Sequence, residues 1–182
     1  MISQAELPDI AALRRGDNEA VSALWRCLHG PALRLAWYWT GDRDEAEDVV
    51  QTAILKALRH LEGYDPGRDF GPWFQRILIN TCRDWKRAAF RRLRDAWTGE
   101  ERESGPALHP VTGEDLGPLQ ELVRQLPRRM RMVFVLRFIE EHPVRTVADI
   151  LDISEDTVRV MSMQARRRLR LAWERLTDEE GM

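Results

Sequence analysis

The segment from Trp73 to Arg94 constrains the fold most, because its periodicity fits only an amphipathic helix. At about 100° per residue, the apolar side chains gather on one side, from Phe74 through Leu78 to Trp85. The opposite side carries five arginines, one asparagine and no acidic residue: Arg76, Asn80, Arg83, Arg87, Arg91 and Arg94. Trp73 projects near this basic side. A basic stripe of this kind is either a solvated surface or a binding site for an anion.

A basic stripe beside an exposed aromatic ring suits single-stranded nucleic acid. Arginines neutralise phosphates, and an aromatic face stacks an unpaired base at roughly 1–3 kcal/mol. The preceding loop, Gly63–Gly71, is rich in helix breakers and brings Tyr64, Arg68 and Phe70 close to the start of the helix. Such a loop is either a specificity element or a plain connection.

The segment Arg43–Leu61 predicts a second amphipathic helix, with Asp42 and Glu45 in the spacing of a reciprocal cap. Its outer face is acidic but includes one leucine: Asp44, Glu47, Asp48, Gln51 and Leu55. An apolar residue surrounded by acids often marks a contact with a partner protein. The alternative is again a solvated face.

Before it, Asp17 is placed to cap a helix from Asn18 to about Leu28, with Trp25 on its inner side. Gly30-Pro31 is expected to interrupt or kink this helix, which resumes over Ala32–Thr40.

Apolar periodicity stops between about Thr98 and Pro118, where glycine and proline alternate with polar residues. We therefore divide the chain into a domain at 1–97, a flexible linker at 98–118 and a domain at 119–182. Strand-like alternation of useful length is absent from the sequence. The expected fold class is all-α, with two small helical domains.

The second domain contains the pattern of a helix-turn-helix. A short helix at Thr146–Leu151, a turn at 152–154 and a long basic helix from Glu155 to about Arg175 follow one another, with Ser154 as the N-cap. The predicted DNA-facing residues are Ser154, Thr157, Arg159, Val160, Met163, Gln164, Arg166 and Arg167. A helical hairpin with a basic tail is the alternative.

Composition excludes several classes of protein. The net charge of −2 argues against a non-specific DNA binder, and the longest apolar runs are too short to cross a bilayer. The N-terminus lacks the features of a signal peptide, so we expect a cytoplasmic protein. Cys27 and Cys82 form neither a disulfide framework nor a zinc pattern, and Cys82 is expected to be a buried thiol. With no catalytic motif and no histidines at ligand spacing, we expect no enzyme, cofactor or metal.

Three stretches together resemble the minimal, extracytoplasmic-function sigma factors of bacterial RNA polymerase. They are GDRDEAEDVVQTAILKAL (Gly41–Leu58), FGPWFQRILINTCRDWKR (Phe70–Arg87) and LPRRMRMVFVLRFIEE with TVADILDISEDTVRVMSMQARRRLR (Leu126–Glu141 and Thr146–Arg170). They occur in the order found in that family, with its linker between them.

The resemblance implies a role for each face. The acidic face would dock on the clamp helices of the largest subunit of core RNA polymerase. Trp73, Asn80 and the loop Tyr64–Gly71 would open and read the downstream promoter element, and the arginine stripe would follow the phosphates of the non-template strand. The helix-turn-helix would read the upstream element as duplex DNA. The resemblance also implies an anti-sigma factor as a partner and a chain that is monomeric when free.

Two departures and two rival functions stay open at this point. Arg159 is the one outward cation before Arg166, so we expect more thymine-methyl contacts and fewer phosphate contacts than in relatives. His142-Pro143 lies within Glu140–Arg145 and leaves the geometry of the hairpin there open. The rivals are a helix-turn-helix regulator that binds duplex DNA without polymerase docking, and a protein adaptor whose basic helix is merely solvated.

Overall fold

The computed structural model of the protein describes residues 7–96 and 118–180, with side chains over 7–88 and 118–177. All regular structure in these residues is helical, and the chain divides into two compact units, Met1–Pro110 and Val111–Met182. The expected all-α, two-domain fold is therefore confirmed. Residues 98–117 of the predicted linker lie outside the described residues, and Pro118 is already helical, so the domain boundaries stay a prediction.

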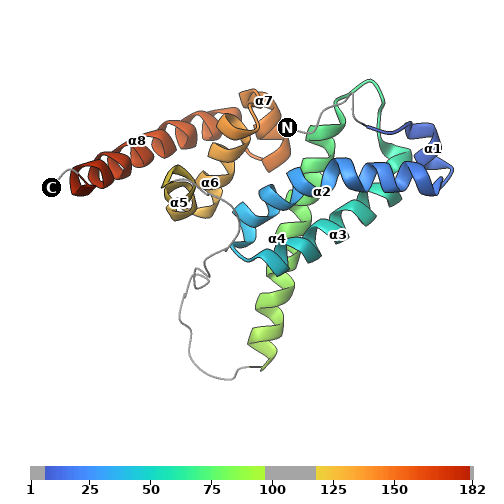
Figure 1. Cartoon of the computed structure of the whole chain (residues 1–182), viewed down its shortest axis with the longest axis horizontal. Helices are drawn as coiled ribbons and strands as arrows, with labels where there is room; N and C mark the ends of the chain where they lie inside the picture. Colours follow the sequence, from blue (N-terminus) through green and yellow to red (C-terminus); the bar gives the residue numbers. More distant parts are fainter. Residues whose placement is uncertain (1–6, 97–117, 181–182) are drawn as a thin grey trace. The chain divides into compact units, whose positions relative to one another are not determined.

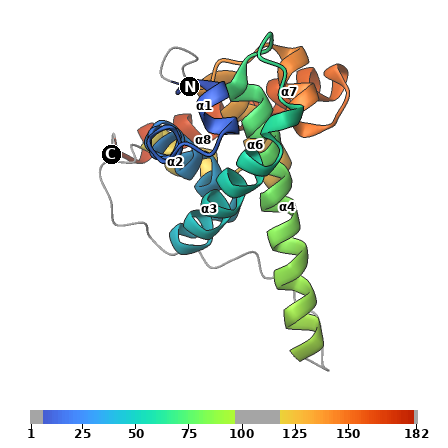
Figure 2. The same cartoon turned by 90° about the vertical axis from the view of Figure 1, so that its right-hand side faces the viewer.

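The first unit contains α1 (Ile10–Arg14), α2 (Asn18–Thr40), α3 (Arg43–Arg59), the 3-10 turn η2 (Leu61–Gly63) and α4 (Phe70–Ala96). α2 packs on α3, and α4 packs on both (Figure 1). The far half of α4 projects beyond α2 and α3, also in the view turned by 90° (Figure 2). The bundle therefore buries the first half of α4 and leaves its second half extended.

α2 is one continuous helix, so the predicted interruption at Gly30-Pro31 is wrong. Asp17 caps it as predicted, because its Oδ1 accepts hydrogen bonds from the amides of Glu19 and Ala20 at 2.9 Å. Pro31 removes one helical hydrogen bond, but buried side chains continue in the same phase on both sides of it. They are Leu24, Leu28, Ala32 and Leu35. Burial of this unbroken stripe outweighs the local cost of the proline.

α3 begins after Asp42, whose Oδ1 accepts a hydrogen bond from the amide of Glu45 at 2.9 Å, as the capping pattern predicts. Its inner face is buried at Ala46, Val49, Val50, Ala53 and Ala57, as predicted. Ile54 is buried in addition, whereas Leu58 is only half-buried. The predicted helix ran to Leu61, but the α-helix ends at Arg59 and Leu61 is buried in η2.

The inner face of α4 is wider than the periodicity indicated. Phe74, Leu78 and Thr81 are buried as predicted, and the Cys82 thiol is buried too. Gln75 and Ile79 are also buried, although neither belongs to the predicted stripe. α4 meets α2 and α3 at once, so it buries residues on a broader arc than a helix with one neighbour.

The second unit contains α5 (Pro118–Gln125), α6 (Arg128–Phe134), the π-helical turn η3 (Val135–Ile139), α7 (Val144–Leu151) and α8 (Glu155–Glu180). α8 packs on α5, α6 and α7, and its C-terminal part runs past them (Figure 1). The inner face of α8 is buried at Val158, Ala165 and Leu169, as predicted. Met161 and Ala172, on the same face, are half-buried.

The helix-turn-helix is confirmed with the predicted three-residue turn. Asp152 ends α7 in the left-handed conformation (φ 56°, ψ 55°), which aspartate tolerates better than most residues. Ser154 precedes α8 and caps it, because its Oγ accepts a hydrogen bond from the amide of Thr157 at 3.2 Å. α7 starts at Val144, two residues earlier than predicted, because Pro143 is extended (ψ 157°) and can precede a first helical turn.

The hairpin left open by the sequence is closed by one backbone turn and two hydrogen bonds. Glu141 adopts a positive φ of 57°, and the amide of His142 donates a hydrogen bond to the carbonyl of Leu136 at 2.9 Å. The guanidinium of Arg137 donates to the carbonyl of His142. These contacts fix the chain between η3 and α7.

None of the helices in the described part of the chain is long and apolar enough to cross a membrane.

Candidate nucleic-acid and protein interfaces

The basic face of α4 is exposed along its described length. Arg76, Asn80 and Arg87 are exposed and Arg83 is half-buried, opposite the packed face of the helix. The side chains of Arg91 and Arg94 lie outside the described residues. Because the fully buried side chains of α4 lie on the other face, this face can meet an extended anion.

Asn80 has a defined orientation on this face. Nη1 of Arg83 donates a hydrogen bond to Oδ1 of Asn80 at 3.1 Å. The amide oxygen of Asn80 is thereby used as an acceptor, and its Nδ2 is the end that can donate to a ligand. The pair therefore presents hydrogen-bond donors side by side, which suits phosphate oxygens and base acceptors.

Asp84 borders the basic face, which the stripe of arginines alone did not reveal. Its carboxylate lies 4.0 Å from Arg87 on the same helix and 3.3 Å from Lys56 on α3. All three side chains are substantially exposed, so these ion pairs contribute little to stability. They reduce the local positive potential near Arg87.

Tyr64, Phe70 and Trp73 form an aromatic cluster where the loop enters α4. Trp73 lies 5.0 Å from the ring of Tyr64 and 5.1 Å from that of Phe70, measured between centroids. Tyr64 is 3% exposed and Phe70 is fully buried, whereas Trp73 is half-buried. Neither Tyr64 nor Phe70 offers surface to DNA in this structure, so their predicted direct contact with DNA stays a prediction. Both rings support Trp73, which is the member of the cluster with surface to offer.

The loop before α4 is folded on itself. The hydroxyl of Tyr64 donates to the carbonyl of Arg68 at 2.6 Å, and Oδ1 of Asp65 accepts from the amide of Gly67 at 2.9 Å. The side chain of Arg68 is 83% exposed. The loop thus holds one predicted site residue, Arg68, in solvent while burying another, Tyr64.

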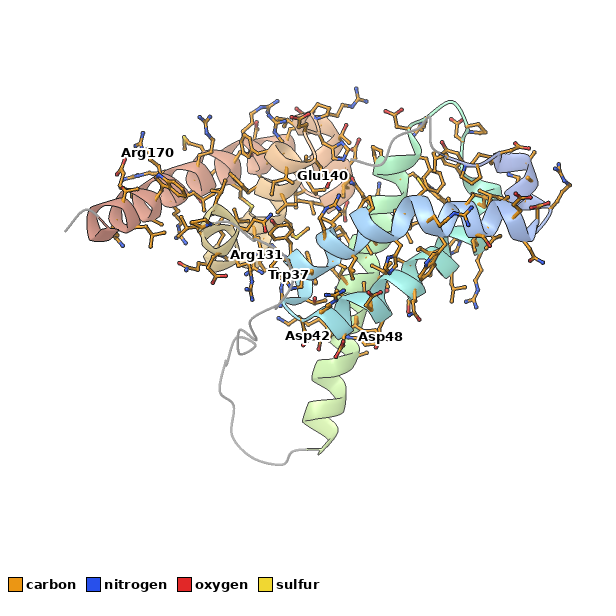
Figure 3. The ribbon with its side chains drawn as sticks, in the orientation of Figure 1. Trp37, Asp42, Asp48, Arg131, Glu140 and Arg170 are labelled. Carbon is orange, nitrogen blue, oxygen red and sulfur yellow. The ribbon has the colours of Figure 1, made fainter. Side chains whose placement is uncertain are left out.

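The acidic face of α3 is exposed as predicted. Asp44, Asp48 and Gln51 are exposed, and Leu55 is 55% exposed in their midst. Figure 3 shows Asp48 near the N-terminal end of α3, close to the capping residue Asp42. The exposed leucine has no place in the core of the unit, which favours a protein contact over plain solvation.

The surface around Glu47 continues onto α2 through a histidine and a tryptophan, which sequence reasoning missed. Nε2 of His29 lies 2.8 Å from Oε2 of Glu47, and His29 stacks on Trp25 with ring centroids 5.0 Å apart. Trp25 was predicted to face inward, but it is 36% exposed. The phase of one helix could not reveal this extension, because it depends on how α2 lies against α3.

The outer face of α8 presents apolar and basic groups together. Val160 and Met163 are 48% and 66% exposed, and Gln164, Arg166 and Arg167 are exposed as well. Ser154 is exposed and Thr157 half-buried at the start of the helix. Arg159 is exposed but engaged, with Glu155 at 2.6 Å and Asp156 at 2.7 Å.

An open hollow of about 600 Å³ adjoins this face. It is lined mainly by arginines from α8, together with groups from η3 and α7: Arg137, Val144, Arg159, Met163, Arg166, Arg167 and Arg170. Sequence reasoning missed Arg137 and Arg170, because a periodicity assigns residues to a helix face but not to a concavity between helices. A basic concavity beside an exposed helix face suits a nucleic-acid backbone.

The chain matches two parts of the Sigma-70 family: region 2 over residues 24–95 and region 4 over residues 116–169. The first match lies within the first unit and the second match lies within the second unit.

Relatives match the chain over most of its length. It is 32% identical over 171 residues to the ECF RNA polymerase sigma-E factor of Escherichia coli (strain K12), covering 86% of this chain and 88% of that protein. It is 30% identical over 148 residues to the RNA polymerase sigma factor SigV of Bacillus subtilis (strain 168), covering 81% and 85%.

Two solved structures share the fold. The sigma factor RpoE of Bartonella quintana, in complex with the anti-sigma factor NepR, matches with a TM-score of 0.64 at 24% identity, over 79% of this chain and 91% of that one. CnrH, in complex with the cytosolic domain of CnrY, matches with a TM-score of 0.63 at 23% identity, over 91% and 94%. Together with the relatives, the family matches and the two units place the chain in one family. It is an ECF sigma factor, which binds core RNA polymerase and directs promoter-specific initiation of transcription.

Proposed function

We propose that the sigma factor divides its work among three faces of its two units. The acidic face of α3 docks on the clamp helices of the largest polymerase subunit. Exposed carboxylates attract a basic partner over distance, and Leu55 supplies an apolar contact at the centre of the face. Trp25 and His29 extend this face onto α2.

The second face, on α4, opens the downstream promoter element. Unpairing of the duplex is offset when an extruded base stacks on Trp73 and when the arginines hold the non-template strand. Asn80 and Arg83 present their donors together, and Asn80 reads the sequence that opens. The loop at 64–71 borders the base, with Arg68 as its exposed cation. No nucleotide is hydrolysed by this chain.

The third face, on α8, reads the upstream element in the major groove. Val160 and Met163 are placed for thymine methyl groups, and Gln164 for adenine. Ser154, Thr157, Arg166 and Arg167 contact phosphates at the edges of the site. The hollow beside the helix adds Arg137 and Arg170 to the backbone contacts.

The observation that carries this division is the pairing of α3 and α4. Two helices packed together in one unit expose oppositely charged faces, one acidic and one basic. A factor that must bind a protein and an opened strand at the same time needs two such surfaces.

The test reconstitutes the chain with core polymerase on a library of promoters and sequences the transcripts. Arg83→Glu with Arg87→Glu should abolish promoter opening while polymerase binding persists, because the change reverses charge on α4 alone. The control is Arg15→Glu with Arg26→Glu, which reverses two exposed charges outside α4. If the α4 variant still opens promoters, the assignment of promoter opening to this face is wrong.

An anti-sigma factor is the further partner that we propose. The RpoE structure contains NepR and the CnrH structure contains part of CnrY, so chains of this fold are held by separate proteins. The exposed acidic face is a surface that such an inhibitor could cover. We propose that the protein works in the cytoplasm, where its polymerase is.

A further inference from the structure

Arg14 makes two long-range hydrogen bonds that no sequence pattern indicated. Its Nη2 donates to the carbonyl oxygen of Leu61 at 3.2 Å and to that of Tyr64 at 3.0 Å. Both carbonyls lie in the chain that leads from α3 into the loop before α4. Hydrogen bonds with a charged donor are stronger than neutral ones, so this contact can fix the conformation of the main chain.

The base of the Arg14 side chain is itself fixed. Oδ1 of Asp9 accepts from the amide of Ala11 at 2.9 Å and caps α1, and Leu13 is buried. Gly16 then turns the chain into α2 at a φ of 75°, a conformation that favours glycine. The guanidinium therefore reaches the loop from a helix that is capped, packed and joined to α2 by a tight turn.

The constraint continues beyond Tyr64. Its ring is packed against Phe70 and Trp73, and its hydroxyl holds the carbonyl of Arg68 at 2.6 Å. Arg14 thus fixes the main chain of Tyr64, and Tyr64 fixes the main chain of Arg68. The exposed Arg68 side chain lies at the end of this series of contacts.

We propose that Arg14 is a positioning residue for promoter selection. It holds the loop at 64–70 in the conformation that sets Arg68 and Trp73 against the opened strand, and it acts through the loop rather than on DNA. The inference rests on the proposed function of that loop. Without Arg14, the carbonyl of Tyr64 loses this donor, and the carbonyl of Leu61 keeps only the backbone amide of Tyr64 at 3.1 Å. The loop then samples more conformations, which weakens discrimination among bases.

The first measurement needs no polymerase or DNA. Amide hydrogen exchange over 61–70 is compared in wild type, Arg14→Ala, Arg14→Lys and Arg15→Ala. Arg15 is an exposed neighbour of the same charge, so its variant controls for electrostatics. Exchange should rise about threefold to tenfold in Arg14→Ala, the loss expected for a hydrogen bond to a charged group at a partly exposed site. It should rise less in Arg14→Lys and stay unchanged in Arg15→Ala.

The second measurement reads the consequence for selection. Each variant is reconstituted with core polymerase on promoters randomised over the downstream element. In Arg14→Ala, the preference for the best base over the next at the loop-read position should fall by about threefold to tenfold. Arg14→Lys should restore part of it, and Arg15→Ala should match wild type. All variants should bind core polymerase with equal affinity. A general loss of folding would instead lower this affinity.

If Arg14→Ala does not fold, a further variant can still contradict the inference. Tyr64→Phe removes only the bond to Arg68 and should lower the same preference. Loop exchange or base preference in the Arg14 variants equal to that of Arg15→Ala would overturn the inference. If wild type gives no promoter-dependent initiation, the proposed function fails instead, and the exchange data show whether Arg14 still orders the loop.

Discussion

Nη1 of Arg159 lies 2.7 Å from Oδ1 of Asp156, within the first turns of α8, the helix that we propose reads the upstream element. Nη2 of the same arginine lies 2.6 Å from Oε2 of Glu155. The first outward cation of α8 is thus neutralised inside its own helix. This restraint fits a reader that depends on apolar contacts at Val160 and Met163 and limits non-specific attraction to DNA.

Releasing Arg159 should strengthen non-specific binding. Glu155→Gln with Asp156→Asn frees the guanidinium for a phosphate, so the plot of log affinity for duplex DNA against log salt should steepen by about 0.9 for the added contact. Fluorescence anisotropy with the isolated protein measures this slope. Glu19→Gln with Glu62→Gln changes net charge equally in the other unit and should leave the slope unchanged. An unaltered slope in the α8 variant would show that the ion pairs with Glu155 and Asp156 do not keep Arg159 from binding phosphate.

Leu55→Asp should weaken docking on core polymerase. Burial of a leucine side chain contributes about 1.5–3 kcal/mol, so affinity should fall by about tenfold or more. Stability should hardly change, because the side chain is 55% exposed in the free protein. Competition against a labelled sigma factor measures the affinity, and Leu171→Asp on α8, 43% exposed, is the control. Equal affinities for the two variants would contradict docking through α3.

Trp73→Ala should slow promoter opening. Stacking of a base on an aromatic ring contributes roughly 1–3 kcal/mol, which corresponds to a loss of about fivefold to 150-fold in open complex. The fluorescence of 2-aminopurine in the opened element reports the reaction. Trp25→Ala, on the acidic side, should leave opening unchanged once polymerase is saturating. Opening at the wild-type level in Trp73→Ala would exclude the indole as the stacking surface.

Glu121→Gln should destabilise the second unit by about 1–2 kcal/mol, less than for a fully buried ion pair because Glu121 is half exposed. Its carboxylate lies 3.1 Å from the buried Arg124. It also opposes the lowering of the pKa of Arg131 to about 10, which is caused by burial and then by Arg128 and Arg124. Hydrogen exchange over 118–177 separates this unit from the first. Unchanged exchange would contradict a stabilising role for the acid.

The lowered pKa of Arg131 predicts the direction in which stability changes with pH. The pKa of Arg131 is lower in the folded state than its ordinary value, so the unfolded state binds more protons above about pH 10. Its contribution to stability is therefore flat at neutral pH and rises with pH through that window. Arg131→Met should remove this part of the slope, measured by denaturant unfolding at several alkaline pH values. A slope equal to that of wild type would argue against the shift.

Local rules predicted much of this fold because the features concerned are local. The caps at Asp17, Asp42 and Ser154 depend on residues two or three positions away. The inner faces of α3 and α8 follow from the helical repeat alone. The ion pairs of Arg159 were equally accessible, since Glu155 and Asp156 stand four and three residues before it.

Features set by long-range packing were out of reach. Pro31 breaks a helix by local rules, and only burial of α2 against its neighbours keeps the helix whole. Tyr64 and Phe70 look like exposed loop aromatics until Trp73 is placed against them. The bonds of Arg14 span 47 and 50 residues, and no periodicity connects positions so far apart.

The support of Trp73 bears on the speed of promoter capture. Its indole is held by Tyr64 and Phe70 before any DNA arrives. A freely rotating tryptophan would lose rotamer entropy on stacking with a base, whereas this one loses it when the protein folds. An extruded base that stacks here meets a surface already in place, so capture needs no ordering step from the protein. We therefore expect the rate of base capture to depend on how often the base leaves its duplex.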